Sequence, residues 1–308
     1  MVEANLGSAK IPSIVAPRRH VGRWVAGVVL LAILVMICVS TYQNHNLNHA
    51  AIRHFLFSGA ILRGLRTTIV LAVLSQIIGT ALGLFIAILR LSRNPVSTAV
   101  GWLYVWLFRG TPLLVQVLIW GNFALFYPRL TVGIPFTDLS ITSYDTNHVL
   151  TAFVSSVLAL SLNEAAYMAE IIRAGILSVD PGQTEATRAL GLSRTQALRK
   201  VVLPQAMRVI VPPSGSQFIN MLKMTSLVSV IAGGDLLTQA QNISAANLRT
   251  IELLVVATAW YLLVTSVSSI GQAMLERRLA RGSSASTSPS TLTMVRARMR
   301  RANVGESR

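Results

Sequence analysis

Five ionisable side chains interrupt long apolar stretches of the sequence: Arg109, Glu164, Glu170, Arg173 and Lys223. A charge at membrane depth is costly, so such groups usually face the protein interior or a water-filled path. An acid in that setting attracts a cationic or zwitterionic solute. These residues therefore offer either contact with a small polar solute or structural ion pairing inside the protein.

Glu164 is the deeper of the two acids, because it precedes Glu170 by more than one helical turn. A later stretch carries Gln217 and Asn220, whose amides suit the carboxylate and ammonium groups of an α-amino acid, although uncharged polar residues also join membrane helices. Lys223 has no acidic neighbour in the sequence. It either flanks a solute path or forms a structural ion pair with Glu164 or Glu170. These four residues are our candidate path residues: Glu164, Gln217, Asn220 and Lys223.

Two further charged positions are interpreted as structural. Glu170 and Arg173 are three residues apart, so they share one helix face and are predicted to form an ion pair. Arg109 precedes Gly110-Thr111-Pro112. Glycine and proline in a membrane helix free backbone groups that need other partners, so this tripeptide predicts a local break. Arg109 itself is interpreted as an anchor on the cytoplasmic side.

The sequence offers little for catalysis or metal binding. It contains no phosphate-binding loop of the form G-x-x-x-x-G-K-S/T and no plausible pairing of a nucleophile with a base. Cys38 is the single cysteine, which excludes an intramolecular disulfide and a cysteine-based zinc site. His45, His49 and His54 cluster without an accompanying acid. We therefore predict that the chain is not an enzyme and holds no catalytic residue, metal or cofactor of its own.

Composition places the elements that carry these residues in a lipid bilayer. Of 308 residues, 53% are hydrophobic and 12% charged, mean hydropathy is +0.59, and the net charge is +16. Low charge density with an excess of one sign is typical of a membrane protein with its basic residues on the cytoplasmic flank. A nucleic-acid partner is not expected, because its binding would require more charge in the folded part.

Six stretches have the length and apolar character of membrane-spanning helices. Three are free of charge and three contain the residues above. We predict an all-α integral membrane protein with these six spans: Trp24–Tyr42, Thr67–Leu89, Val96–Tyr127, Val149–Leu177, Val209–Ala232 and Leu253–Leu275.

The distribution of basic residues predicts the orientation. With the N-terminus inside, nineteen of the 27 basic residues lie on the cytoplasmic side and four lie outside. Both termini are therefore expected in the cytoplasm, with residues 1–23 a basic segment and residues 24–42 an N-terminal membrane anchor rather than a signal peptide. Residues 281–308 are expected to be a disordered basic tail on anionic lipid.

The longest inside connection, residues 178–208, is patterned like two short helices. Asp180 and Pro181 open the first, and Gly191 supplies the left-handed residue that ends it. Ser193 caps the second, and Gln196 completes a capping box; this helix is expected to end before Pro204. Without further information, packing of this pair against the chain's own membrane helices is an equally good explanation of the pattern.

The sequence of this loop resembles that of a known protein family. Glu185-Ala186-Thr187-Arg188-Ala189-Leu190-Gly191, followed by Val202-Leu203-Pro204-Gln205-Ala206, is similar to the EAA loop of ABC importer permeases. Three other blocks resemble the branch that carries histidine, arginine, glutamine, glutamate or opines. These blocks begin at Arg109, Ala165 and Lys223, and the whole resemblance covers residues 60–280.

The resemblance implies a permease domain over residues 60–280, a five-helix core preceded by one extra span. It also implies a multi-pass subunit of the bacterial plasma membrane, paired with a second permease copy or paralogue, two ATPase subunits that bind ATP and Mg²⁺, and an extracytoplasmic solute-binding protein. The first loop helix would be the coupling helix that docks on the ATPase. The expected coupling residues are Glu185, Ala186, Ala189, Leu190, Gly191, Leu203 and Pro204.

Some positions depart from the family pattern. Thr187 replaces a frequent alanine, a change we expect to be tolerated on a polar face, and Met224 stands where an acid or asparagine is usual. Ser214-Gly215-Ser216 also differs. These departures bear on the solute rather than on the class of transporter. A secondary transporter or channel is the alternative, and it would continue to transport after ATP depletion, whereas a membrane scaffold would show no flux.

Overall fold

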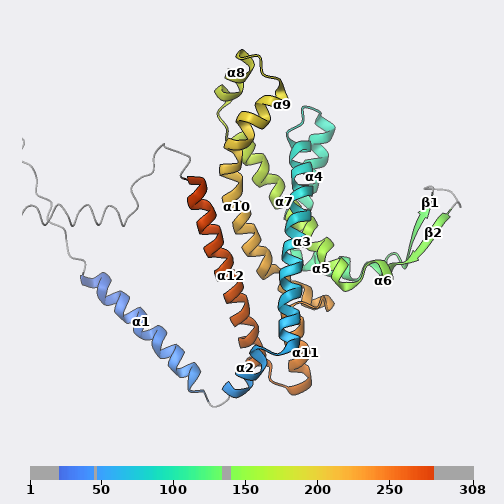
Figure 1. Ribbon diagram of the computed structural model, residues 1–308. Helices are drawn as coiled ribbons and strands as arrows, with labels where there is room; N and C mark the ends of the chain where they lie inside the picture. The colour runs from blue at the N-terminus through green and yellow to red at the C-terminus, as the bar shows by residue number, and fades with distance from the viewer. Residues whose placement is uncertain (1–20, 45–46, 134–139, 281–308) are drawn as a thin grey trace, which may run out of the picture. The chain divides into compact units, whose positions relative to one another are not determined.

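The computed structural model describes residues 21–44, 47–133 and 140–280 (Figure 1). The chain divides into two compact units after Asn48. The first unit contains helix α1, Val21–Tyr42. Its apolar side chains between Val25 and Ile37 are exposed, as expected for a helix surrounded by lipid. The predicted basic segment lies outside the described residues up to position 20, and so does the predicted tail.

The second unit is mostly helical. Its longer helices are α3 (Gly59–Arg90), α4 (Pro95–Gly110), α5 (Leu113–Gly121), α7 (Ala152–Leu177), α10 (Leu203–Met224), α11 (Leu236–Asn247) and α12 (Thr250–Ala280). Its shorter elements are α2 (His49–Leu56), α6 (Thr146–Val149), α8 (Pro181–Ala189), α9 (Arg194–Ala197), 3-10 turns at Phe123–Leu125 and Thr225–Ile231, a π turn at Leu198–Val202, and strands β1 (Arg129–Gly133) and β2 (Ser140–Asp145).

Three helices of the described chain, α3, α7 and α12, are long and apolar enough to cross a membrane without a break. The predicted span Val96–Tyr127 is bent instead, because the axes of α4 and α5 meet at 97°. The predicted span Val209–Ala232 ends at a second bend, where the segment Arg194–Ile231 meets α11 at 44°. The prediction of one helix over Val96–Tyr127 is therefore wrong, whereas the predicted break at Gly110-Thr111-Pro112 is confirmed, because α4 ends at Gly110 and α5 begins after Pro112.

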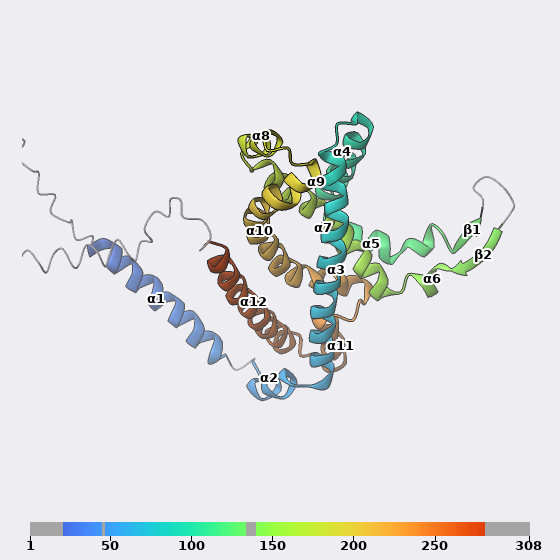
Figure 2. The same ribbon diagram turned by 45° about the horizontal axis from the view of Figure 1, so that its top comes forward.

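Helices α3 and α7 pack side by side in the same direction (Figure 2). Gly79 and Gly83 of α3 form a G-x-x-x-G pair, a motif that lets helix backbones approach closely. A Cβ atom added at Gly79 would lie 2.8 Å from the Cβ of Glu164, and one added at Gly83 would lie 2.7 Å from the Cβ of Met168. The two glycines therefore set the distance between the helices and hold Glu164 against α3.

The buried core joins four helices around this pair. Leu71 of α3, Val117 of α5, Leu160 of α7 and Leu222 of α10 are all fully buried or nearly so and belong to one apolar cluster. These side chains stabilise the bundle by van der Waals packing, because lipid tails are as apolar as leucine and burial from lipid adds no hydrophobic driving force. Two of these helices, α7 and α10, carry the candidate path residues, so this core fixes their relative positions.

A small antiparallel hairpin, β1 with β2, corrects the all-α prediction (Figure 1). Arg129 pairs with Asp145, and Thr131 Oγ1 donates to Ser143 Oγ at 3.4 Å. Both strands are short and rich in β-branched residues, which favour extended backbone. The hairpin extends away from the helices, and the connection between its strands, residues 134–139, lies outside the described residues.

The caps predicted for loop 178–208 are confirmed. Asp180 Oδ1 accepts a hydrogen bond from Gly182 N at 2.6 Å, and Gly191 has φ = 73°. Ser193 and Gln196 form the reciprocal capping box. The end of the loop differs from prediction.

The second loop helix does not stop before Pro204. It continues from α9 through the π turn Leu198–Val202 directly into α10. Leu203 N bonds to Leu198 O across this wider turn. Proline has no N–H and its ring crowds the preceding turn, so a regular α-helix would be interrupted at Pro204. The π turn instead lets the chain pass from loop to membrane helix without a break.

Candidate functional site

A cavity of about 440 Å³ lies where the α4–α5 bend meets α7 and α10. The bend, α7 and α10 each contribute both polar and apolar residues to its lining. The lining residues are Arg109, Gly110, Thr111, Pro112 and Leu113 from the bend, Asn163, Glu164 and Tyr167 from α7, and Gln217, Asn220, Met221 and Met224 from α10.

Side chains replace the backbone hydrogen bonds that the bend removes. Gln116 is 6% exposed, and its Nε2 donates to Phe108 O at 2.9 Å and to Thr111 O at 3.2 Å. Asn163 Nδ2 donates to Phe108 O at 3.0 Å and to Gln116 Oε1 at 3.2 Å. Irregular backbone at membrane depth requires such partners. These hydrogen bonds therefore stabilise the bend and hold α4 and α5 against α7.

Glu164 is the buried acid of the cavity. It is 4% exposed, and its Oε1 accepts a hydrogen bond from Gln76 Nε2 at 3.2 Å. Gln76 Nε2 also lies 3.2 Å from Thr80 Oγ1. No basic side chain forms an ion pair with Glu164 among the described residues. Its carboxyl group therefore lies at the cavity without a salt-bridge partner among the described residues.

Arg109 supplies the opposite charge in the same cavity. Its guanidinium carbon lies 5.1 Å from the centre of the Tyr167 ring, within the range of a cation–π contact. Arg109 was interpreted from the sequence as an anchor on the cytoplasmic side, and its place in the cavity lining was not predicted. The cavity thus combines an acid with a cation, an arrangement that matches the ammonium and carboxylate groups of an α-amino acid.

Helix α10 brings Gln217 and Asn220 to the cavity but not Lys223. Asn220 Nδ2 donates weakly to Gln217 Oε1, at 3.4 Å. Lys223 is exposed, and the alternative that it pairs with Glu164 or Glu170 is wrong, because neither acid has a lysine partner in the described structure. Lys223 and Met224 point differently because adjacent helical positions are about 100° apart.

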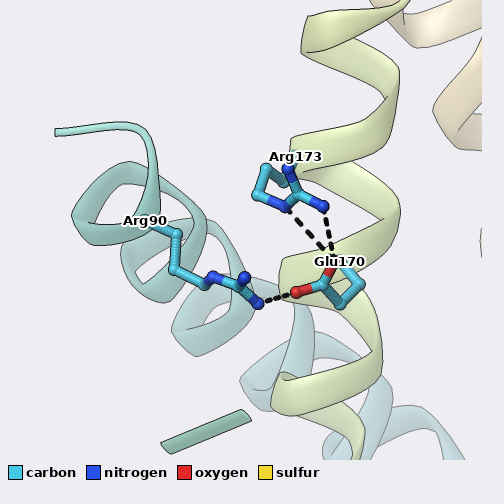
Figure 3. Close-up of polar contacts among 3 residues, drawn as sticks. All are labelled: Arg90, Glu170 and Arg173. Atoms are coloured by element: carbon cyan, nitrogen blue, oxygen red, sulfur yellow. Dashed lines mark hydrogen bonds and ion pairs between the residues drawn. The ribbon is translucent and has the colours of Figure 1, made fainter. Parts of the chain in front are cut away.

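Glu170 lies between two arginines (Figure 3). Arg173 donates to Glu170 Oε2 through Nη2 at 3.0 Å and through Nε at 3.2 Å. Arg90, at the end of α3, contacts Glu170 Oε1. The contact of Arg90 with Glu170 was not predicted from the sequence, because 80 residues separate the two. This cluster cross-links α3 and α7 outside the cavity.

Helix α8 presents its small residues outward. Glu185, Ala186 and Ala189 are exposed, and Leu190 is 78% exposed. Leu203 and Pro204 are also exposed. This face of α8 does not pack against the described membrane helices, although the opposite side of the helix is buried.

Thr187 requires a correction. It is 3% exposed, and its hydroxyl donates to Thr184 O at 2.8 Å, so it occupies the buried side of α8 rather than the polar face expected for it. The local hydrogen bond satisfies the hydroxyl where alanine would need none.

Metal binding finds no support in the described part of the chain, where no three His, Cys, Asp or Glu side chains gather. His49 and His54 lie on α2, and His45 lies outside the described residues.

Comparison with known proteins agrees with this architecture. Residues 79–281 match the family model described as binding-protein-dependent transport system inner membrane component. The chain is 41% identical over 268 residues to the arginine transport system permease protein ArgU of Corynebacterium glutamicum, covering 87% of this chain and 83% of the relative. It is 35% identical to the glutamine transport system permease protein GlnP of Escherichia coli, over 71% of this chain and 92% of that relative.

A solved structure described as an amino acid ABC transporter with histidines has the same fold. Its TM-score is 0.64 at 37% identity, over 75% of this chain and 99% of that one. A chain of a bacterial transporter that imports alginate shares the fold alone, with a TM-score of 0.54 at 14% identity.

Proposed function

The chain belongs to the family of binding-protein-dependent transport system inner membrane components, and on that basis we propose that it carries a polar α-amino acid through the cavity between the α4–α5 bend, α7 and α10. It is a multi-pass permease subunit of an ABC importer and not an enzyme. The proposal concerns its solute, its path and its partners.

One observation carries the solute proposal: Glu164 and Arg109 line the same cavity. Glu164 receives the solute's cationic group, and Arg109 lies ready for its carboxylate. Gln217 and Asn220 add amide donors and acceptors on the α10 wall. The names of the similar permeases, which include arginine and glutamine transport, support the same solute class.

In this proposal α8 couples the permease to ATP hydrolysis by a partner subunit. Its exposed Ala186, Ala189 and Leu190 form a small apolar surface that a partner can cover, and Gly191 ends it. We assign this surface to an ATPase subunit, which binds ATP and Mg²⁺, because this sequence has no phosphate-binding loop of its own. A second permease, self or paralogue, and an extracytoplasmic binding protein complete the assembly.

The proposed topology has six spans with both termini in the cytoplasm. Helix α1 is the extra span, and the bent pairs count as one span each. The excess of basic residues on the side of α8 and α9 supports this orientation.

The partner proposal is tested by purifying the chain gently from its native membranes and identifying stoichiometric partners by mass spectrometry. We expect an ATPase with a phosphate-binding loop, with or without a second permease. Repeated recovery of this chain alone, under conditions that preserve known complexes, would favour a secondary transporter.

Gly191→Asp is expected to reduce solute uptake about tenfold or more while the membrane domain stays folded. The substitution places a β-carbon at φ = 73°, which costs about 1–2 kcal/mol for residues other than glycine, and adds a charge beside the exposed end of α8. Uptake and solute-stimulated ATP hydrolysis are measured on the reconstituted complex.

Gly191→Asn is the matched control, because it makes the same backbone change without the charge. We expect it to retain most of the uptake, since no neighbouring atom lies within 4 Å of the added β-carbon. Normal uptake by Gly191→Asp would remove Gly191 from the docking surface.

A further inference from the structure

A second cavity, of about 350 Å³, lies behind α8 at the end of the bundle that carries the loop helices. Its walls come from the end of α7, from α8, from α9 with the π turn, and from the α3–α4 connection. Its apolar side is formed by Ile176, Val179, Leu192, Leu198 and Val202.

Three arginines from three separate segments line the same cavity: Arg93 from the α3–α4 connection, Arg188 from α8 and Arg194 from α9. No acidic residue lines it. Within the residues that the structure describes, none of the three forms an ion pair, since both observed pairs involve Glu170. The acids nearest in sequence, Asp180 and Glu185, are not part of the lining.

A cavity with this lining fits an amphipathic anion. Guanidinium groups bind phosphate oxygens bidentately and are the preferred protein groups for phosphate recognition. The apolar side offers contact for a hydrocarbon segment, which a small soluble phosphate ester lacks. The cavity also lies where α3 and α7 end, which is the headgroup level for helices that span the bilayer.

We propose that this cavity binds the phosphate group of an anionic phospholipid, with Arg93, Arg188 and Arg194 around the phosphate and the start of an acyl chain against Leu192, Leu198 and their neighbours. A soluble phosphate ester would use the same arginines, but the apolar wall favours the lipid. The bound lipid would tie the loop helices to the membrane surface. The proposal does not depend on which solute the protein carries.

The test is lipid retention by the full chain, purified in detergent with whatever subunits accompany it and analysed by native mass spectrometry. Dioleoyl phosphatidylglycerol is titrated against dioleoyl phosphatidylcholine. We expect preferential retention of phosphatidylglycerol, weakened about 100-fold by the combined change Arg93→Gln, Arg188→Gln and Arg194→Gln, because each basic residue contributes about fivefold at an anionic membrane.

The matched control removes the same charge elsewhere on that side, by Arg199→Gln, Lys200→Gln and Arg277→Gln. These three residues are exposed and do not line the cavity. We expect the control to retain phosphatidylglycerol within about twofold of the unchanged chain. If the triple variant does not purify, each single arginine variant is expected to lose about fivefold.

Three results would overturn the proposal. Equal loss in both triple variants would show that only the total charge matters. Displacement of the lipid by glycerol phosphate at equal concentration would assign the cavity to a soluble ester. Loss of a protein partner with unchanged lipid retention would assign the arginines to a protein contact.

Discussion

Glu164→Gln is expected to lower the rate of solute uptake by about 10- to 100-fold, with assembly of the importer unchanged. The substitution keeps the size of the side chain but removes the negative charge that we propose the solute contacts. A hydrogen bond to a charged group contributes about 1.5–3 kcal/mol, and ~1.4 kcal/mol corresponds to a factor of ten. Initial rates in proteoliposomes, normalised to assembled complex, measure the effect.

Glu170→Gln is the matched control, because the same change is made six residues along the same helix, outside the cavity. Glu170 holds Arg90 and Arg173, so its loss leaves two partly buried cations with a weaker acceptor. We expect a lower thermal unfolding midpoint and a nearly normal uptake rate per folded molecule. Equal loss of uptake in the two variants would contradict the assignment of Glu164 to the path.

Gly83→Val is expected to destabilise the membrane domain by about 3 kcal/mol, at the upper end of the usual cost of overpacking. An added β-carbon at this position would lie 2.7 Å from Met168 Cβ and 2.9 Å from Ala165 O. A backbone oxygen cannot rotate away, so α3 and α7 must separate. The thermal unfolding midpoint and the fraction of monodisperse protein in detergent report the loss.

Gly271→Val makes the same substitution in another membrane helix, α12, where no atom lies within 4 Å of the added β-carbon. We expect little change in its unfolding midpoint. Similar destabilisation at Gly83 and Gly271 would mean that valine acts through helix propensity and that close approach of α3 and α7 is unimportant.

Features that depend on residues close together in the sequence were predicted correctly. The apolar stretches, the break before α5 and the caps of the loop helices each depend on residues within a few positions of one another. The Gly79–Gly83 spacing is also a local signal, but it was not used to predict the close packing of α3 against another helix. The hairpin strands are too short and polar to stand out from an ordinary outside loop.

Features that depend on tertiary packing were not accessible. Arg90 meets Glu170 across 80 residues, and no local pattern marks that pairing. Arg109 and Glu164 are 55 residues apart in the sequence and line one cavity because α4 packs against α7. Thr187 lies on the buried side of α8 rather than on the expected polar face, because helical spacing gives only relative directions and the neighbouring helices decide which direction is buried.

The uninterrupted passage from α9 through the π turn into α10 has a mechanical consequence. Because the helix is continuous, a rotation of α9 also turns α10, which carries Gln217 and Asn220 at the cavity. From Leu203 to Gln217 the helix rises by about 21 Å, so a rotation of ~10° about its loop end displaces Gln217 by ~4 Å. Pro212 and Pro213 lie inside α10, and each lacks the N–H that would donate a helical hydrogen bond, yet the helix continues through them to Met224. A push of a few ångströms at the loop would thereby widen or narrow the space around an amino acid.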